Sequence, residues 1–303
     1  MDFADMLLNR FDGEAEMKKN NSALICFSML ETGKLLSRLA IRITRSKSEK
    51  TSITLLYFID KSEEMLHSED MDEYQHKIIT DFIPTEEKDK ITLRLFIRSS
   101  EDYYADIIQI SEEQKSNMIL VGINNNEFSS RLLKKYGQLK SEPANSELFI
   151  LDQFEEKEAQ ALKNINALLN RDTVSIGLFF DSGTTLFRRL FIPILQKSDI
   201  HLFTYLYRIG QQENMKMMIW DAIGIIESDV KIQKLYQFIS KKTEGRIYLW
   251  DNNKKIGSDF IQEQDLVIIG TEGWNKLICT PLPWTDSLPS TLIIKETTNS
   301  IQL

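Results

Sequence analysis

The sequence has few of the residues that catalysis and metal binding usually require. Its 303 residues include three histidines, His67, His76 and His201, which are widely separated. No Cys/His cluster has the spacing of a metal site. The Ser–Gly pair at 182–183 lacks the preceding glycine of a G-x-S-x-G nucleophile motif. We therefore expect no catalytic residue, no metal ligand and no enzymatic activity.

Cysteine and net positive charge are also scarce. Cys26 and Cys279, the two cysteines, lie far apart in apolar contexts, which favours buried free thiols in a reducing cytoplasm over a disulfide. The formal net charge is −8. Because binding to phosphate backbones needs a clustered basic excess, this charge argues against a nucleic-acid partner.

Long hydrophobic runs are missing as well. No apolar run approaches the roughly 20 residues that cross a bilayer. Asp2 and Asp5 stand where a signal peptide would carry positive charge. The chain itself is expected to be a cytoplasmic polypeptide, either free-standing or as one part of a larger membrane protein.

Two similar stretches show how the chain is organised. Met118–Val121 is wholly apolar, Gly122 ends it, and a polar turn and a helical pattern follow. Residues 265–274, DLVIIGTEGW, repeat this arrangement. A short apolar run of this kind is typical of a central strand in a parallel sheet. Ligands of such sheets bind outside the carboxyl ends of the strands.

Strand-like runs alternate with helical patterns along the whole chain, five runs in each half. The predicted strands are 23–27, 52–59, 91–97, 118–121, 174–180, 189–194, 215–222, 246–250, 265–269 and 291–295. This alternation predicts right-handed crossovers and an α/β fold with two doubly wound, parallel, five-stranded sheets in tandem.

The pattern also suggests domain boundaries. Residues 1–21 are charged and polar and are expected to form a linker from a membrane domain. The first domain is expected at 22–183 and the second, more degenerate one at 184–303. We expect each domain to hold its own sheet and the two domains to pack together, because a parallel sheet needs cover on both faces.

The order of these elements resembles a tandem universal stress protein. TLLYFID at 54–60 and ILVGINNNEFSSRLL at 119–133 carry this likeness. Over nearly the whole chain after residue 21, the sequence more closely resembles the cytoplasmic C-terminal region of bacterial monovalent cation:proton antiporters. The stretches that carry this second resemblance are ALICFSMLETGKLLSRLA (23–40), DIIQISEEQKSNMILVGINNNEF (106–128), VSIGLFFD…LFIPI (174–194) and QDLVIIGTEGWNKLI…LPSTLIIK (264–295).

The resemblance implies candidate nucleotide-binding residues in the first half. ATP-binding stress proteins have an Asp after the first strand and a G-x-x-G turn after the fourth, followed by G-[ST]. Here no Asp stands near Phe27 or Ser28, and Gly122 is followed by asparagines. The degenerate positions are Gly122, Asn124, Ser129 and Ser130. We prefer to interpret the two serines as helix caps.

The second half keeps more of the nucleotide-binding pattern than the first half does. Gly270 and Gly273 have the G-x-x-G spacing, and glycines there would let backbone N–H groups approach a phosphate. However, Glu272 is expected to place a carboxylate where the phosphate would sit, and G-[ST] is absent. A turn that only needs flexible backbone is the preferred interpretation. No cofactor is expected, although the resemblance leaves ATP or AMP open.

The sequence leaves three candidate functions to test. The first is a non-catalytic regulatory, ligand-sensing or dimerisation domain of a cation:proton antiporter, on the cytoplasmic side of the inner membrane. Its partners would be the membrane domain of the same polypeptide, a second copy and a small-molecule ligand. The second is a free-standing tandem stress protein that binds an adenine nucleotide. The third, a nucleotide hydrolase, has no supporting residues. Trp274, Leu282 and Trp284 are candidates for an apolar dimer surface or for core.

Overall fold

The computed structural model describes most of the chain from residue 22 to residue 297. The described residues are 22–44, 51–66, 70–82, 90–123, 135–139, 142, 146, 150–211, 215–280, 282–285 and 287–297. The expected linker, 1–21, lies outside them. Among the described helices, none combines the length and apolar character of a bilayer-spanning segment.

Strands and helices alternate in both halves, as predicted. The first half contains β1 (Ser22–Phe27), α2 (Leu30–Thr44), β2 (Thr51–Phe58), α3 (Lys61–Leu66), α4 (Met71–Phe82), β3 (Ile91–Arg98), α5 (Tyr103–Glu113), β4 (Met118–Ile123), α8 (Glu156–Leu169) and β5 (Ser175–Phe180). The second contains β6 (Arg189–Ile194), η2 (Lys197–His201), α9 (Leu202–Gly210), β7 (Lys216–Asp221), α10 (Ile225–Ser228), α11 (Val230–Lys242), β8 (Ile247–Leu249), α12 (Ser258–Gln262), β9 (Leu266–Gly270), α13 (Thr271–Cys279) and β10 (Ser290–Lys295).

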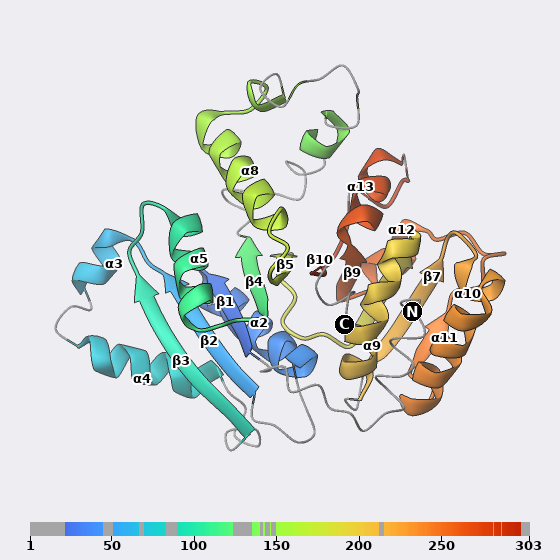
Figure 1. Cartoon of the computed structure of the whole chain (residues 1–303), viewed down its shortest axis with the longest axis horizontal. Helices are drawn as coiled ribbons and strands as arrows, with labels where there is room; N and C mark the ends of the chain where they lie inside the picture. The colour runs from blue at the N-terminus through green and yellow to red at the C-terminus, as the bar shows by residue number, and fades with distance from the viewer. Residues whose placement is uncertain are drawn as a thin grey trace.

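All ten strands form one sheet, in the order β3-β2-β1-β4-β5-β10-β9-β6-β7-β8. Each half is parallel and has the same internal order, which confirms the doubly wound α/β class. The expectation of two separate sheets is wrong, because β5 and β10 pair antiparallel from Phe180–Thr291 to Ile176–Lys295 (Figure 1). Each of these buried strands would otherwise leave a row of unpaired backbone groups at an edge.

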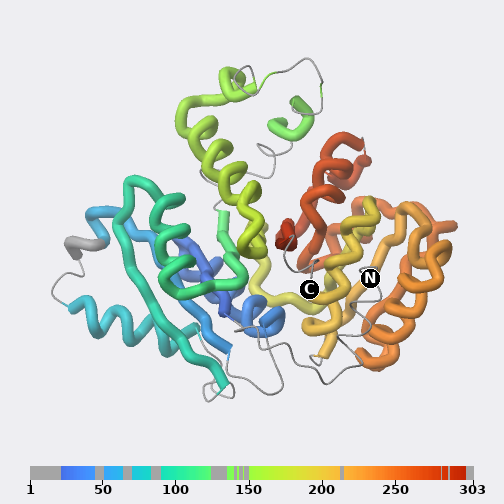
Figure 2. Tube along the Cα trace, viewed as in Figure 1, coloured from blue at the N-terminus to red at the C-terminus, as the bar shows by residue number. Residues whose placement is uncertain are grey.

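The core likewise runs through both halves. One cluster of buried side chains packs α2, α4, α9 and α11 on one face of the sheet. The other packs α5, α8, α12 and α13 on the opposite face. Figure 2 shows the blue-to-green first half beside the yellow-to-red second half. Helix cover on both faces explains why β1, β5 and β9 are buried along their whole length, whereas edge strand β3 is partly exposed.

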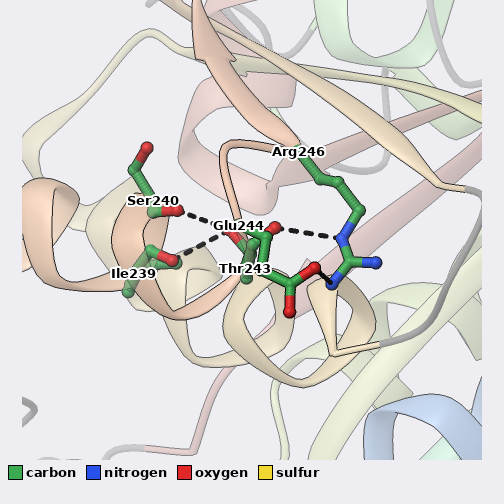
Figure 3. Close-up of polar contacts among 5 residues, drawn as sticks. All are labelled: Ile239, Ser240, Thr243, Glu244 and Arg246. Atoms are coloured by element: carbon green, nitrogen blue, oxygen red, sulfur yellow. Dashed lines mark hydrogen bonds and ion pairs between the residues drawn. The ribbon is translucent and has the colours of Figure 1, made fainter.

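In the turn between α11 and β8, side chains cap the C-terminal end of the helix (Figure 3). The buried Thr243 hydroxyl donates to the carbonyl oxygens of Ile239 (2.9 Å) and Ser240 (3.2 Å). Arg246 Nε donates to the Thr243 carbonyl oxygen at 3.0 Å. Glu244 and Gly245 have φ values of 54° and 72°, the left-handed conformation that reverses a chain after a helix. This arrangement satisfies the last carbonyl groups of α11.

Three local expectations need correction. The predicted helix over 199–210 is two elements, a 3-10 helix η2 and then α9. The predicted strand over 246–250 is shortened to β8, with three residues. Cys279 is exposed at the end of α13, whereas Cys26 is a buried thiol as expected; both are free. Burial raises the pKa of Cys26 well above its usual value and keeps it in the unreactive thiol form.

Candidate functional site

The strand order places one topological switch point in the second half of the sheet. The chain leaves β6 toward η2 and leaves β9 toward α13, and β6 and β9 are neighbours. Because the strand order reverses at this point, the carboxyl ends of β6 and β9 form the position where doubly wound sheets bind ligands. Gly270 and Gly273 both lie here.

The expected glycine turn is the first turn of a helix. Gly270 is the N-cap residue of α13 and Gly273 is the third helical residue. Helix N-termini carry unsatisfied N–H groups, and a glycine N-cap has no side chain to accept from them. Here the Gly273 N–H donates to Oδ1 of Asp199 at 3.2 Å. Asp199, from η2, therefore caps α13 in place of Gly270.

Asp199 is fully buried, and its carboxylate is held by backbone donors. Oδ2 accepts from the N–H groups of Leu195 and Gln196, both at 2.9 Å. With the Gly273 bond, three N–H groups from two segments converge on one carboxylate. These hydrogen bonds tie the segment before η2 to the first turn of α13.

The two glycines are needed because Asp199 comes so close. A Cβ on Gly273 would lie 2.5 Å from Asp199 Oδ2, and one on Gly270 would collide with Oδ1. Glu272, which was expected to block this position, is exposed in the first turn of α13. The blocking carboxylate is therefore Asp199. It lies 71 residues before Gly270 in the sequence, and its one local signal is the Gln196–Asp199 capping box.

His201 lies beside this cap. Its Nδ1 is 2.7 Å from the Ser198 carbonyl oxygen, whereas its buried Nε2 has no hydrogen-bond partner. His201 Cε1, which is bonded to Nε2, would lie 3.0 Å from a Cβ on Gly270. The His201 ring also meets Tyr205 edge-on, at 6.4 Å between ring centroids.

Tyr205, which contacts the His201 ring, is paired with Glu296. The buried Tyr205 hydroxyl donates to Glu296 Oε2. Burial, followed by the nearby Glu296 carboxylate, raises the pKa of Tyr205 well above its usual value.

This raised pKa predicts a loss of stability in alkali. Unfolded tyrosine ionises near pH 10, whereas folded Tyr205 stays protonated, so the contribution of Tyr205 is complete below pH 10 and is lost as pH rises toward its folded pKa. We expect it to reduce the unfolding free energy by about 1.4 kcal/mol per pH unit above pH 10. Urea titrations of wild type and Tyr205→Phe, between neutral pH and pH 11, measure this: the variant should show a smaller slope. Equal slopes would contradict the prediction.

The first half has the equivalent switch point, at the carboxyl ends of β1 and β4. Gly122 lies within β4, where a Cβ would approach Thr32 Cγ2 of α2 to 2.7 Å. Gly122 thus allows close packing of α2. Asn124, Ser129 and Ser130 lie outside the described residues, so their expected roles stay predictions.

The structure does not bring the three described candidates, Gly122, Gly270 and Gly273, into one site. Strand β10 runs antiparallel to β5, so the strands of the two halves point in opposite directions. Gly122 and the Gly270–Gly273 pair therefore lie at opposite ends of the sheet's strands, each at the switch point of its own half.

The remaining polar and aromatic candidates have structural partners. In the turn after β5, Asp181 accepts from the Gly183 N–H at 2.8 Å and from the Thr32 hydroxyl at 2.9 Å, so it fastens this turn to α2. Trp274 and Trp284 are core residues rather than an exposed dimer surface, since they are 5% and 1% exposed. Within the described part of the chain, no group of three or more His, Cys, Asp or Glu side chains could hold a metal ion.

Comparisons with known proteins match at the level of the fold. No family model matches the chain, and no curated protein matches it. Among solved structures, it is similar to the cytoplasmic domain of a prokaryotic cation chloride cotransporter, with 10% identity, 91% of this chain and 95% of that chain covered, and a TM-score of 0.50. It is also similar to a universal stress protein from Archaeoglobus fulgidus, with 15% identity, coverage of 92% and 97%, and a TM-score of 0.49.

Proposed function

We propose that this chain is a non-catalytic regulatory region of a cation:proton antiporter, located on the cytoplasmic side of the inner membrane. The observation that carries the proposal is the likeness to a cation transporter's cytoplasmic domain, which spans 91% of this chain. This coverage includes residues of both halves, which form one continuous sheet in this chain. Residues 1–21 would connect the sheet to the membrane domain. A small ligand or a second copy would bind here and favour one transport state.

The hydrogen bonds of Asp199 in the second half support this function over that of a nucleotide-binding stress protein. Three backbone N–H groups that would suit a phosphate already bind Asp199. A nucleotide would have to displace a fully buried carboxylate from these donors. A homodimer remains part of the proposal, with its contact on a surface other than Trp274 and Trp284.

Deletion of residues 22–303 from the antiporter polypeptide tests the regulatory function. We expect the membrane domain to insert and to transport. Its cation-driven proton flux, measured in vesicles as a function of pH, should differ from that of the intact polypeptide by about fivefold or more at one pH at least, a factor typical of allosteric coupling. The control is Lys61→Ala in the intact polypeptide, which removes an exposed ion pair with Glu101 and should leave flux unchanged. Unaltered flux and pH dependence after the deletion would remove the regulatory function.

Titration calorimetry with ATP and Mg²⁺ tests the free-standing stress protein, the second candidate. We expect no saturable heat at micromolar protein, because Asp199 fills the second-half position and the first half lacks the G-x-x-G pair. An ATP-binding stress protein is the positive control. Micromolar binding would favour the second candidate. Gly270→Val is unsuitable as the blocking variant, since its Cβ would collide with Asp199 and disturb the fold itself.

A further inference from the structure

We propose that β3 is the docking edge for a second copy of this chain, with the two β3 strands paired antiparallel about a two-fold axis at Leu95. The sheet of one copy would then continue into the sheet of the other. This contact rests on the homodimer that the proposed function includes, but it requires no membrane domain.

Strand β3 is a long edge that is open on one side. It has eight residues, pairs in parallel with β2 and is the outermost strand of the sheet, so no described strand covers its other side. Proteins usually keep such edges short, since their unpaired N–H and C=O groups can pair with another chain. The opposite edge strand, β8, follows this rule with three residues. Strand β3 is therefore the edge that is long enough to hold a further strand.

The bonds of β3 to β2 identify the backbone groups that face the open side. The Arg98 carbonyl oxygen accepts from the Ile59 N–H at 2.9 Å, so the backbone groups of Arg98 face β2. Successive residues of a strand direct these groups to opposite sides. The odd-numbered residues between 91 and 97 therefore direct theirs to the open edge. Two copies related by an axis at Leu95 would set these residues opposite one another, and opposite residues would exchange both of their N–H···O bonds.

The charged side chains of β3 select this register. Arg94 and Arg98 share one face of the strand with Thr92 and Phe96. With the axis at Leu95, Arg94 lies opposite Phe96 of the second copy, and Arg98 lies opposite Thr92. An axis at residue 94 or at residue 96 would instead place arginine opposite arginine, which is destabilising.

The other face of β3 has an apolar row that the second copy would cover. Leu93, Leu95 and Ile97 pack against the core cluster of that face, but each remains partly exposed. In the proposed register, Leu95 meets its own equivalent and Leu93 meets Ile97, so all three form apolar cross-strand pairs. Apolar pairs on one face and separated arginines on the other make β3 complementary to itself.

Substitutions of Thr92 test the contact with little effect on the fold, because Thr92 is exposed. Analytical ultracentrifugation of the 303-residue chain should show a monomer–dimer equilibrium. Thr92→Glu would face Arg98 of the second copy, and the axis repeats this pair. We therefore expect the dimer dissociation constant to fall by about threefold or more, and Thr92→Arg to raise it by a similar factor.

Net charge alone predicts the opposite signs. The chain carries −8, so an added Glu would weaken a contact governed by overall charge, and an added Arg would strengthen it. Tyr248→Glu and Tyr248→Arg are the matched controls, since Tyr248 is exposed on the other edge strand, β8. In about 0.15 M salt, where distant charges are screened, they should leave the dissociation constant unchanged within about twofold.

Cysteine cross-linking tests the register. The background is Cys279→Ser, which removes the exposed native thiol. Leu95→Cys should form a disulfide-linked dimer on mild oxidation, because the Cα atoms of a hydrogen-bonded antiparallel pair lie about 5.5 Å apart. Leu93→Cys and Ile97→Cys should not cross-link alone, since each would lie about 14 Å along the strand from its equivalent. An equimolar mixture of these two variants should cross-link.

Each other outcome overturns the inference or leaves a second measurement to decide it. A chain that stays monomeric up to its solubility limit overturns it, as does a dimer that responds to Thr92 as net charge predicts. Cross-linking of Leu93→Cys alone would show another register and also overturns it. If Leu95→Cys does not fold, the mixture of the Leu93 and Ile97 variants decides. A monomer whose deletion from the antiporter still alters flux would remove this contact and keep the regulatory function.

Discussion

Replacement of Leu120 by alanine should destabilise both halves of the protein together, by about 2–5 kcal/mol. Leu120 is fully buried in β4, in the first half, and its side chain packs against Gly177 of β5, next to the junction with β10. All four tryptophans lie after residue 184, so fluorescence reports the second half. Because one sheet and both core clusters cross the junction, the fluorescence midpoint should fall as far as the circular-dichroism midpoint.

Leu186→Ala provides the matched control for this prediction. Leu186 lies between β5 and β6 and is 39% exposed, so its truncation should change stability by less than about 0.5 kcal/mol. A Leu120 variant whose circular dichroism shows an early transition, while its tryptophan fluorescence keeps the wild-type midpoint, would mean that the halves unfold separately. The antiparallel junction would then be too weak to couple them.

Trp284→Ala should cost about 3–5 kcal/mol, the largest loss expected of a single substitution here. Trp284 is 1% exposed and meets Phe191 of β6 and Trp220 of β7 edge-on, at 6.0 and 6.1 Å between ring centroids. Its removal would leave a large cavity over the centre of the second half. Chemical denaturation followed by far-ultraviolet circular dichroism measures the loss.

Tyr248→Ala is the comparison for Trp284. Tyr248 is 45% exposed on edge strand β8, so its loss should cost far less. Were the two variants equally stable, Trp284 would have to be a surface residue. The dimer surface suggested by the sequence would then again include it.

The strands could be predicted because their burial leaves a direct mark on the sequence. Met118–Ile123 and Leu266–Gly270 have helices on both faces, so they are apolar at nearly every position. The junction between β5 and β10 left no such mark. Either strand could have ended its own sheet under a helix or loop, since strands pair through main-chain N–H and C=O groups, which nearly every residue carries whatever its side chain.

The sequence marked Gly270 and Gly273 as candidate nucleotide-site positions and favoured a turn that only needs flexible backbone. In the structure both glycines lie at the start of α13, against the Asp199 carboxylate. Glu272 seemed to be the blocking carboxylate because it is adjacent in the sequence, yet in the first turn of a helix it points to solvent. Asp199 reaches the glycines from a different strand end, and only the strand order brings it there.

The antiparallel pairing of β5 and β10 also determines where the strand ends of the two halves lie. The carboxyl ends of the first-half strands lie at one end of the sheet and those of the second-half strands at the other, because β5 and β10 reverse the strand direction between them. A partner docked over the ends of β1 and β4 would leave the ends of β6 and β9 uncovered. The two sets of strand ends are therefore separate surfaces, joined by one continuous sheet.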